Sequence, residues 1–198
     1  MTEQVWTIKK VLDWSTAHFH KNGLDNARLN AEWLLGDVLQ LDRVKLYLNF
    51  DKILNKNELS SFRSMIEQRL DHKPLQYILG HYDFMGIDLL LNEDVLIPRP
   101  ETEILVETAI EHFKRKRTEI NVLEIGVGSG CIPVSLHTHL KSDVNYDGLE
   151  ISSAAISLAT QNFKKHELPE KFKIFNHDFS LFISITLLPL IKKSPASF

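Results

Sequence analysis

The chain has 198 residues, of which 43% are hydrophobic and 25% charged, and its formal net charge is −3. This composition is typical of a globular protein, and the absence of a basic excess argues against direct nucleic-acid binding. A single cysteine, Cys131, excludes an internal disulfide framework and a cysteine-rich zinc site. The polar segment Met1–Lys10 does not resemble a signal peptide, and the longest apolar stretch, Leu181–Ile191, is about half of the roughly 20 residues that span a bilayer. We therefore expect a cytoplasmic chain with no membrane partner.

Residues 1–73 have the pattern of a small helical bundle, which we assign as a first domain. Apolar residues recur at helical spacing in three segments, and a short fourth piece covers residues 46–48. Asp25 or Asn26 is expected to cap the second helix, and Asn57 the last one. The apolar positions are Val5, Ile8, Leu12 and Phe19, then Leu29, Trp33 and Leu34, then Leu59, Phe62, Ile66 and Leu70.

The pattern changes at Pro74, the first proline of the chain. Short β-favouring segments separated by glycines predict a β-hairpin linker over residues 74–97. These segments are Gln76–Leu79, Tyr82–Met85 and Ile87–Leu91. A helix is then expected after Pro100, with acidic residues in its first turn and with Leu105, Ala109 and Phe113 as its apolar positions.

The second half of the chain alternates between strand and helix patterns. Strands are predicted at Val122–Ile125, Tyr146–Leu149 and Phe172–Phe175, and helices at about Ile132–Leu140 and Ser153–His166. Strands that alternate with helices form parallel sheets with right-handed crossovers. The sequence therefore predicts an α/β domain over residues 98–198.

A glycine-rich loop follows the first of these strands. Glycine occupies Gly126, Gly128 and Gly130, and Pro133 is tolerable only if a helix opens just before it. Ligands of open α/β sheets bind at the carboxyl ends of the strands, where this loop lies. The spacing Gly-x-Gly-x-Gly differs from the Gly-x-Gly-x-x-Gly of dinucleotide sites, and no Gly-Lys-Ser/Thr of a phosphate-binding loop follows.

Three acids near the ends of strands narrow the choice of ligand. Glu124 precedes the loop and would repel phosphate but pair with an ammonium group, while Glu150 ends the next strand and could accept hydrogen bonds from both ribose hydroxyls. Asp178 follows the third strand and could accept from an adenine amine. A ligand with an ammonium group, a ribose and an adenine but no phosphate matches S-adenosylmethionine. The alternative is that these are ordinary turn glycines and surface acids.

Two histidine pairs were weighed as metal ligands. His18 and His20 lie two apart on a predicted helix and so point in different directions, and His137 and His139 lie at the end of another helix. No further ligand cluster supports either pair, so no metal site is predicted.

Several motifs together resemble the release factor N5-glutamine methyltransferases, over about residues 1–179. They are Pro-Leu-Gln-Tyr-Ile-Leu-Gly at 74–80, Phe84 and Gly86, Val-Leu-Ile-Pro-Arg-Pro-Glu-Thr-Glu at 95–103, the loop at 124–130, and Leu-Glu-Ile-Ser at 149–152. The resemblance implies an N-terminal helical bundle, a β-hairpin linker and a class I, Rossmann-like methyltransferase domain that uses S-adenosylmethionine. Such enzymes methylate the side-chain amide of the glutamine in the Gly-Gly-Gln motif of class 1 peptide chain release factors.

The resemblance also assigns site residues. The loop would wrap the methionine part of the cofactor, Glu150 would hold the ribose, and Asp178 and Phe179 would contact the adenine. The helical domain would help to dock the release factor, and a monomer is expected. The complete predicted cofactor site is Glu124, Gly126, Val127, Gly128, Ser129, Gly130, Glu150, Asp178 and Phe179.

The sequence departs from the family at its C-terminal end. Family members position the substrate amide with an Asn-Pro-Pro-Tyr motif after the fourth strand, whereas no Asn-Pro pair occurs in this sequence. The segment 180–198 is apolar and rich in serine and proline instead of acidic. We therefore expect a truncated or frameshifted, incomplete methyltransferase domain with an aberrant tail, no catalytic residue and impaired activity. The alternative is a non-catalytic remnant that binds a release factor.

Overall fold

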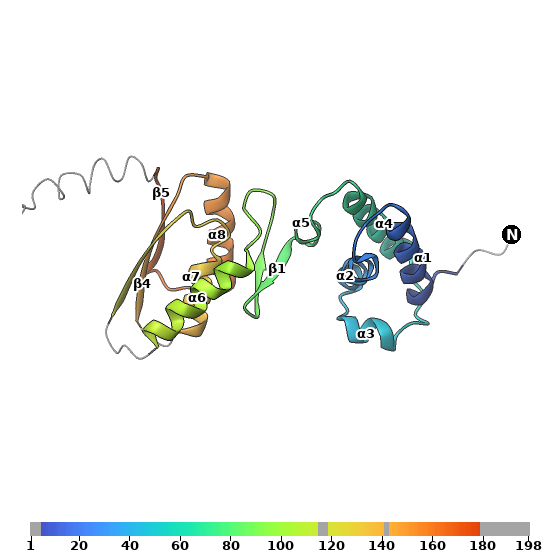
Figure 1. The fold of residues 1–198 in the computed structure, drawn as a ribbon, viewed down its shortest axis with the longest axis horizontal. Helices are drawn as coiled ribbons and strands as arrows, with labels where there is room; N and C mark the ends of the chain where they lie inside the picture. Colours follow the sequence, from blue (N-terminus) through green and yellow to red (C-terminus); the bar gives the residue numbers. More distant parts are fainter. Residues whose placement is uncertain (1–4, 115–118, 141–142, 179–198) are drawn as a thin grey trace, which may run out of the picture. The chain divides into compact units, whose positions relative to one another are not determined.

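The computed structural model describes residues 5–114, 119–140 and 143–178, and it divides the chain into two compact units (Figure 1). Unit 1 covers Met1–Leu79 and unit 2 covers Gly80–Phe198. The predicted adenine contact Phe179 and the predicted aberrant tail, residues 180–198, lie outside the described residues. None of the described helices is long and apolar enough to cross a membrane.

Unit 1 is helical, as predicted, although three expected apolar positions, Val5, Leu29 and Trp33, are 48%, 40% and 51% exposed. Its helices are α1 (Ile8–Lys21), α2 (Ala27–Leu39), α3 (Arg43–Leu48), α4 (Lys56–Leu70) and α5 (Leu75–Leu79). Their fully buried side chains include Ile8, Leu12, Phe19, Leu34, Leu35 and Leu46.

The start of α4 corrects one prediction. The helix is capped by Asn55, not by Asn57, because Glu58 stands three residues after Asn55 and completes a capping box. The Asn55 side chain accepts a hydrogen bond from the Glu58 N–H at 2.9 Å, and the Glu58 carboxylate accepts one from the Asn55 N–H at 2.7 Å. Asn26 does precede α2, but its side chain makes no capping hydrogen bond there.

The segment Gln76–Leu79, predicted as β-favouring, is part of helix α5 instead. The Pro74 carbonyl accepts hydrogen bonds from the Tyr77 and Ile78 N–H groups, which starts a helical turn. Leu75, Ile78 and Leu79 then pack against the core of unit 1. Burial of these side chains outweighs the β preference of the local sequence.

Unit 2 opens with the predicted hairpin. Strands β1 (His81–Phe84) and β2 (Ile87–Leu90) pair antiparallel, with Phe84 opposite Ile87. The two turn residues, Met85 and Gly86, have φ of 54° and 77°, as a tight hairpin turn requires.

Helix α6 (Pro100–Phe113) follows, with Pro100 in its first turn. Val106 is buried, and Ala109, Ile110 and Phe113 pack against the core. Leu105, predicted on the apolar side, is 61% exposed, because it lies one position away from the buried stripe.

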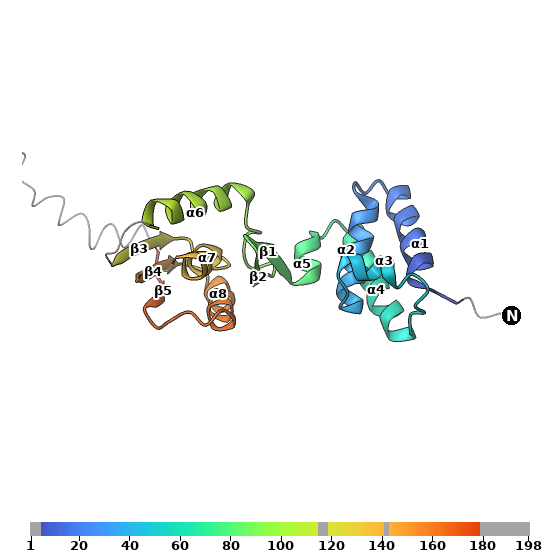
Figure 2. The ribbon, with the colours of Figure 1, turned by 90° about the horizontal axis from the view of Figure 1, so that it is seen from below.

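The remainder of unit 2 is a parallel sheet with helical crossovers. Strands β3 (Ile120–Ile125), β4 (Val144–Glu150) and β5 (Phe172–Asn176) pair in the order β3-β4-β5, joined by α7 (Cys131–His139) and α8 (Ser153–Lys165). Helices α6, α7 and α8 lie on one side of this sheet in both views (Figures 1 and 2). The predicted order of strands and helices is confirmed. Because the strands are parallel, their three carboxyl ends lie at the same end of the sheet.

Candidate cofactor site

The loop between β3 and α7 has the backbone that its glycines permit. Gly126, Gly128 and Gly130 have φ of 81°, 56° and 78°, in the left-handed region where a side chain would be strained. A Cβ atom built on Gly126 or Gly128 would meet no atom within 4 Å, so the space above both residues is open to a ligand. At Gly130 a Cβ would lie 3.0 Å from Phe163 Cε1, so this third glycine also allows close packing on α8.

Glu150, at the end of β4, ties the loop to the start of α8. Its Oε2 accepts a hydrogen bond from the Gly128 N–H at 3.0 Å, and its Oε1 accepts from the N–H groups of Ile151 and Ser152 at 2.9 and 3.0 Å. A carboxylate offers about four acceptor positions, so one is left at Oε2. The structure thus brings Glu150 to the loop, with one acceptor position of its carboxylate free of backbone donors.

The side chain of Glu124 lies close to the start of the glycine loop, on the face of the sheet that the helices cover. Tyr146 Oη donates a hydrogen bond to Glu124 Oε2 at 2.6 Å. Burial raises the pKa of Glu124 to about 7; the Tyr146 hydrogen bond opposes this rise, and the negative charge of Glu150 adds to it. Among the described residues Glu124 forms no ion pair. It is therefore an acid that can gain or lose its proton near neutral pH beside an open loop.

Asp178 lies in the stretch that leaves β5 at the same end of the sheet. The preceding N–H, that of His177, donates to the Glu150 carbonyl at 3.1 Å, which fixes this stretch beside the end of β4. The Asp178 residue is half-buried. All three predicted acids thus lie at or just after the carboxyl ends of adjacent strands, whereas Phe179 lies outside the described residues.

Asn162 supports the loop from α8, a role that the sequence analysis missed. Its fully buried side chain donates to the carbonyls of Leu90 and Ser129 at 3.0 and 2.9 Å, and it accepts from the Leu90 N–H at 2.7 Å. The hairpin, the loop and α8 are therefore joined at one amide. The sequence feature that could have indicated this role is an asparagine on the apolar face of α8, three residues after Ala159 and four after Leu158.

Gly148 in the centre of β4 was also missed. A Cβ atom there would lie 2.5 Å from Val127 Cγ2 and 2.8 Å from Tyr146 Oη. Only glycine leaves room for both groups beneath the loop. A lone glycine inside a strand is the sequence signal for such a close approach.

Two other kinds of group could carry chemistry: the single cysteine and a cluster of metal-ligating side chains. Burial raises the pKa of the Cys131 thiol to about 11, so the thiol stays protonated and is a poor nucleophile at neutral pH. Within residues 5–114, 119–140 and 143–178 no three His, Cys, Asp or Glu side chains cluster as a metal site would require.

A parallel β-α-β-α-β unit with a glycine loop after its first strand and an acid at the end of its second is a Rossmann-like arrangement, which class I methyltransferases share with other cofactor-binding proteins. Residues 10–80 match the family described as the PrmC N-terminal domain. The chain is 48% identical over 168 residues to a protein of Geobacter sulfurreducens named release factor glutamine methyltransferase, covering 84% of this chain and 58% of that protein. The predicted resemblance to release factor glutamine methyltransferases is therefore confirmed over most of the chain.

A second relative has the same name, and a similar share of its length is matched. A release factor glutamine methyltransferase of Chlorobaculum tepidum is 36% identical over 180 residues, which are 89% of this chain and 61% of that protein. The chain thus spans 58% and 61% of the lengths of these two relatives.

Among solved structures, the N-terminal domain of human METTL16 is 20% identical, with a TM-score of 0.38, covering 73% of this chain and 53% of that one.

Proposed function

We propose that this chain carries the cofactor-binding part of a methyltransferase that acts on peptide chain release factors. The donor would be S-adenosylmethionine, and the acceptor the side-chain amide nitrogen of the glutamine in the Gly-Gly-Gln motif of class 1 release factors. The observation that carries the proposal is the open glycine loop with Glu124 and Glu150 beside it, in a chain whose relatives are named as such enzymes.

Each part of the cofactor has a suitable partner in this site. The open backbone at Gly126 and Gly128 would lie along the methionine part, and ionised Glu124 would pair with its ammonium group. The one free acceptor position of Glu150 would take a ribose hydroxyl, while Asp178 and Phe179 would contact the adenine. Two carboxylates beside the loop disfavour a phosphate-bearing ligand. When bound, the cofactor supplies a methyl group on a positively charged sulfur.

An amide nitrogen is a weak nucleophile, so the substrate amide must be held close to the methyl carbon, at about 3–3.5 Å. The Asn-Pro-Pro-Tyr motif that does this in the resembling family does not occur in these 198 residues. We propose that the chain by itself binds the cofactor but transfers methyl groups poorly, if at all. Cytoplasmic location and a monomeric state belong to the same proposal.

A comparison of ligands tests the class of cofactor. Isothermal titration calorimetry of the purified chain should detect binding of S-adenosylhomocysteine, the demethylated cofactor, and no binding of ATP or NAD under the same conditions. The chain fused to the part of the Geobacter sulfurreducens relative that it does not cover should then methylate a Gly-Gly-Gln release factor. Binding of ATP in place of S-adenosylhomocysteine, or methyl transfer to DNA adenine in place of the release factor, would contradict the proposal.

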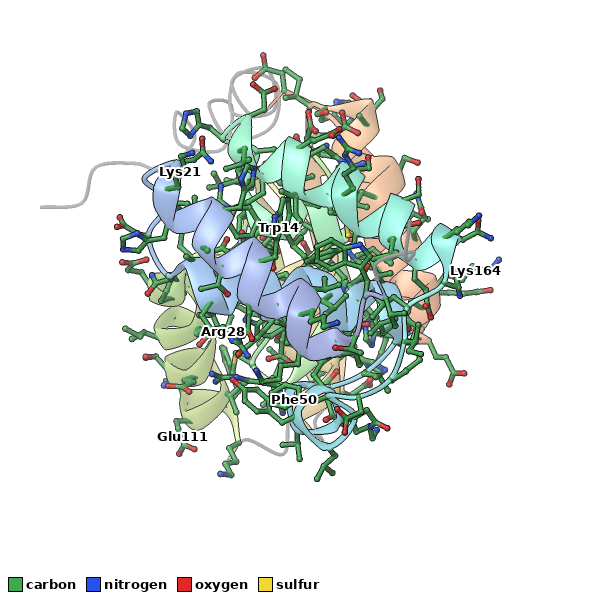
Figure 3. All side chains as sticks on the ribbon, turned by 90° about the vertical axis from the view of Figure 1, so that its right-hand side faces the viewer. Trp14, Lys21, Arg28, Phe50, Glu111 and Lys164 are labelled. Atoms are coloured by element: carbon green, nitrogen blue, oxygen red, sulfur yellow. The ribbon has the colours of Figure 1, made fainter. Side chains whose placement is uncertain are left out.

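Unit 1 offers a surface for the release factor around Trp14. The Trp14 side chain is 50% exposed, stacks on His18 with ring centroids 4.9 Å apart, and contacts the edge of Trp6. In Figure 3 Trp14 and Arg28 are labelled on opposite sides of α1, and Arg28 pairs with Asp13 and Glu32. A half-exposed tryptophan is a side chain of the kind that forms binding hot spots. This surface would also serve the second candidate function, a release-factor binder without catalysis.

Replacement of this tryptophan tests the surface. We expect Trp14→Ala to weaken binding of a class 1 release factor by about tenfold or more, since hot-spot side chains contribute on the order of 2 kcal/mol. The melting temperature of unit 1 should change little. The matched control is Leu48→Ala, because Leu48 is 78% exposed on α3. Surface plasmon resonance would measure both, and equal affinities of the Trp14 variant and the unmodified chain would exclude this surface.

A further inference from the structure

The hydroxyl of Tyr146 is a buried polar group with one specific partner. The Tyr146 side chain is fully buried, and its ring stacks on Phe172 with centroids 5.6 Å apart and meets the edge of Phe163. Its Oη lies 2.6 Å from Glu124 Oε2. The aromatic contacts fix the ring and therefore the position of Oη beside its acceptor, Glu124 Oε2.

The surroundings of this hydroxyl are shaped to admit it. Gly148, two residues further along β4, leaves the space that a Cβ atom would take from Tyr146 Oη and Val127 Cγ2. Val127 belongs to the glycine loop, so the hydroxyl lies directly under the loop. The Tyr146–Glu124 pair therefore lies next to the glycine loop.

The groups that face Glu124 shift the balance between its protonated and ionised forms in opposite directions. Tyr146 and Glu150 approach from β4, and Cys131 approaches from the start of α7. Glu150 disfavours a second negative charge, whereas a donated hydrogen bond stabilises one. In the absence of an ion pair within the described residues, the tyrosine hydroxyl is the group that favours the ionised acid.

We propose that Tyr146 is a positioning residue that favours the ionised form of the Glu124 carboxylate and turns it toward the glycine loop. The hydroxyl occupies Oε2 and leaves Oε1 to accept from a donor above the loop. That donor would be the ammonium group of the cofactor, a step that rests on the proposed function. The pair needs no lysine or arginine and therefore leaves a negative charge available for the ligand.

Tyr146→Phe tests this role, because it removes the hydroxyl and retains the ring. Carbon-13 NMR of the glutamate carboxyl groups in the ligand-free chain should give Glu124 a titration midpoint near 7, as its raised pKa implies. In Tyr146→Phe the midpoint should rise by about one pH unit, since a hydrogen bond to a charged group contributes about 1.5–3 kcal/mol. Glu124→Gln identifies the resonance.

Ligand binding provides the second readout. The Tyr146→Phe variant should bind S-adenosylhomocysteine about tenfold more weakly at pH 6, and the deficit should shrink to about twofold near pH 8, because rising pH restores the ionised acid in both proteins. A purely structural defect would give a deficit that does not depend on pH. In Glu124→Gln the affinity should lose its dependence on pH between 6 and 7.5, which tests the account even if Tyr146→Phe folds poorly.

The outcomes separate the two proposals. An unchanged or lowered Glu124 midpoint in Tyr146→Phe would overturn the role of Tyr146. A raised midpoint would support that role, and if neither protein then bound S-adenosylhomocysteine, the proposed cofactor would be wrong while the positioning of Glu124 stood.

Discussion

Replacement of Asn162 by leucine is expected to destabilise unit 2 by about 3–5 kcal/mol and to abolish an ordered glycine loop. The side chain is fully buried and satisfies the N–H and carbonyl of Leu90 and the carbonyl of Ser129. Leucine has a similar volume but no polar atom, so three buried backbone groups would lose their partner. Each such group costs about 1–3 kcal/mol when it is left unpaired.

Urea denaturation followed by circular dichroism would measure this loss. Gln161→Leu is the matched control, because Gln161 is the neighbouring residue on the exposed side of α8. Its stability should stay within about 0.5 kcal/mol of the unmodified chain. Hydrogen exchange of the Leu90 amide, which donates to Asn162 Oδ1, should accelerate in the Asn162 variant alone. A variant as stable as the control would show that the amide does not hold the loop.

Replacement of Glu150 by glutamine is expected to weaken S-adenosylhomocysteine binding by about 10–100-fold. The change retains the shape of the side chain but removes its charge and turns one acceptor into a donor. The new NH₂ group would face either the Gly128 N–H or those of Ile151 and Ser152, all of which now donate to the carboxylate. Hydrogen bonds to a charged group contribute about 1.5–3 kcal/mol each, which corresponds to this range of affinities.

Calorimetric titration at fixed pH would measure the loss, with Glu170→Gln as the control. Glu170 is an exposed acid of the same unit, so its replacement makes the same change in net charge away from the loop. Equal losses in both variants would mean that net charge, not the contact at the loop, governs binding.

The sequence predicted the elements whose chemistry is local. The glycines at 126, 128 and 130 and the proline at 133 mark the turn from β3 into α7, and the structure has that turn. Tertiary packing decided the rest: burial of Leu75, Ile78 and Leu79 turned a β-favouring segment into α5.

Within the site, the glycine spacing and the acids at strand ends could be identified from single positions. The Tyr146–Glu124 hydrogen bond could not, because it joins residues 22 apart whose alignment depends on the register of β3 against β4. The same holds for Asn162, whose partner Leu90 lies 72 residues away in the hairpin. Contacts of this kind depend on which helices and strands become neighbours in the fold. The spacing of residues along the chain does not indicate which elements these are.

The most direct test of the account is an NMR titration of the ¹⁵N-labelled chain with S-adenosylhomocysteine. If the loop between β3 and α7 holds the cofactor, the largest shifts should fall on the amides of Gly126, Gly128 and Gly130 and on those of Ile151 and Ser152 beside Glu150. Amides of unit 1 should stay in place. Shifts confined to other residues, or none at saturating ligand, would contradict the claim that these residues form a cofactor site.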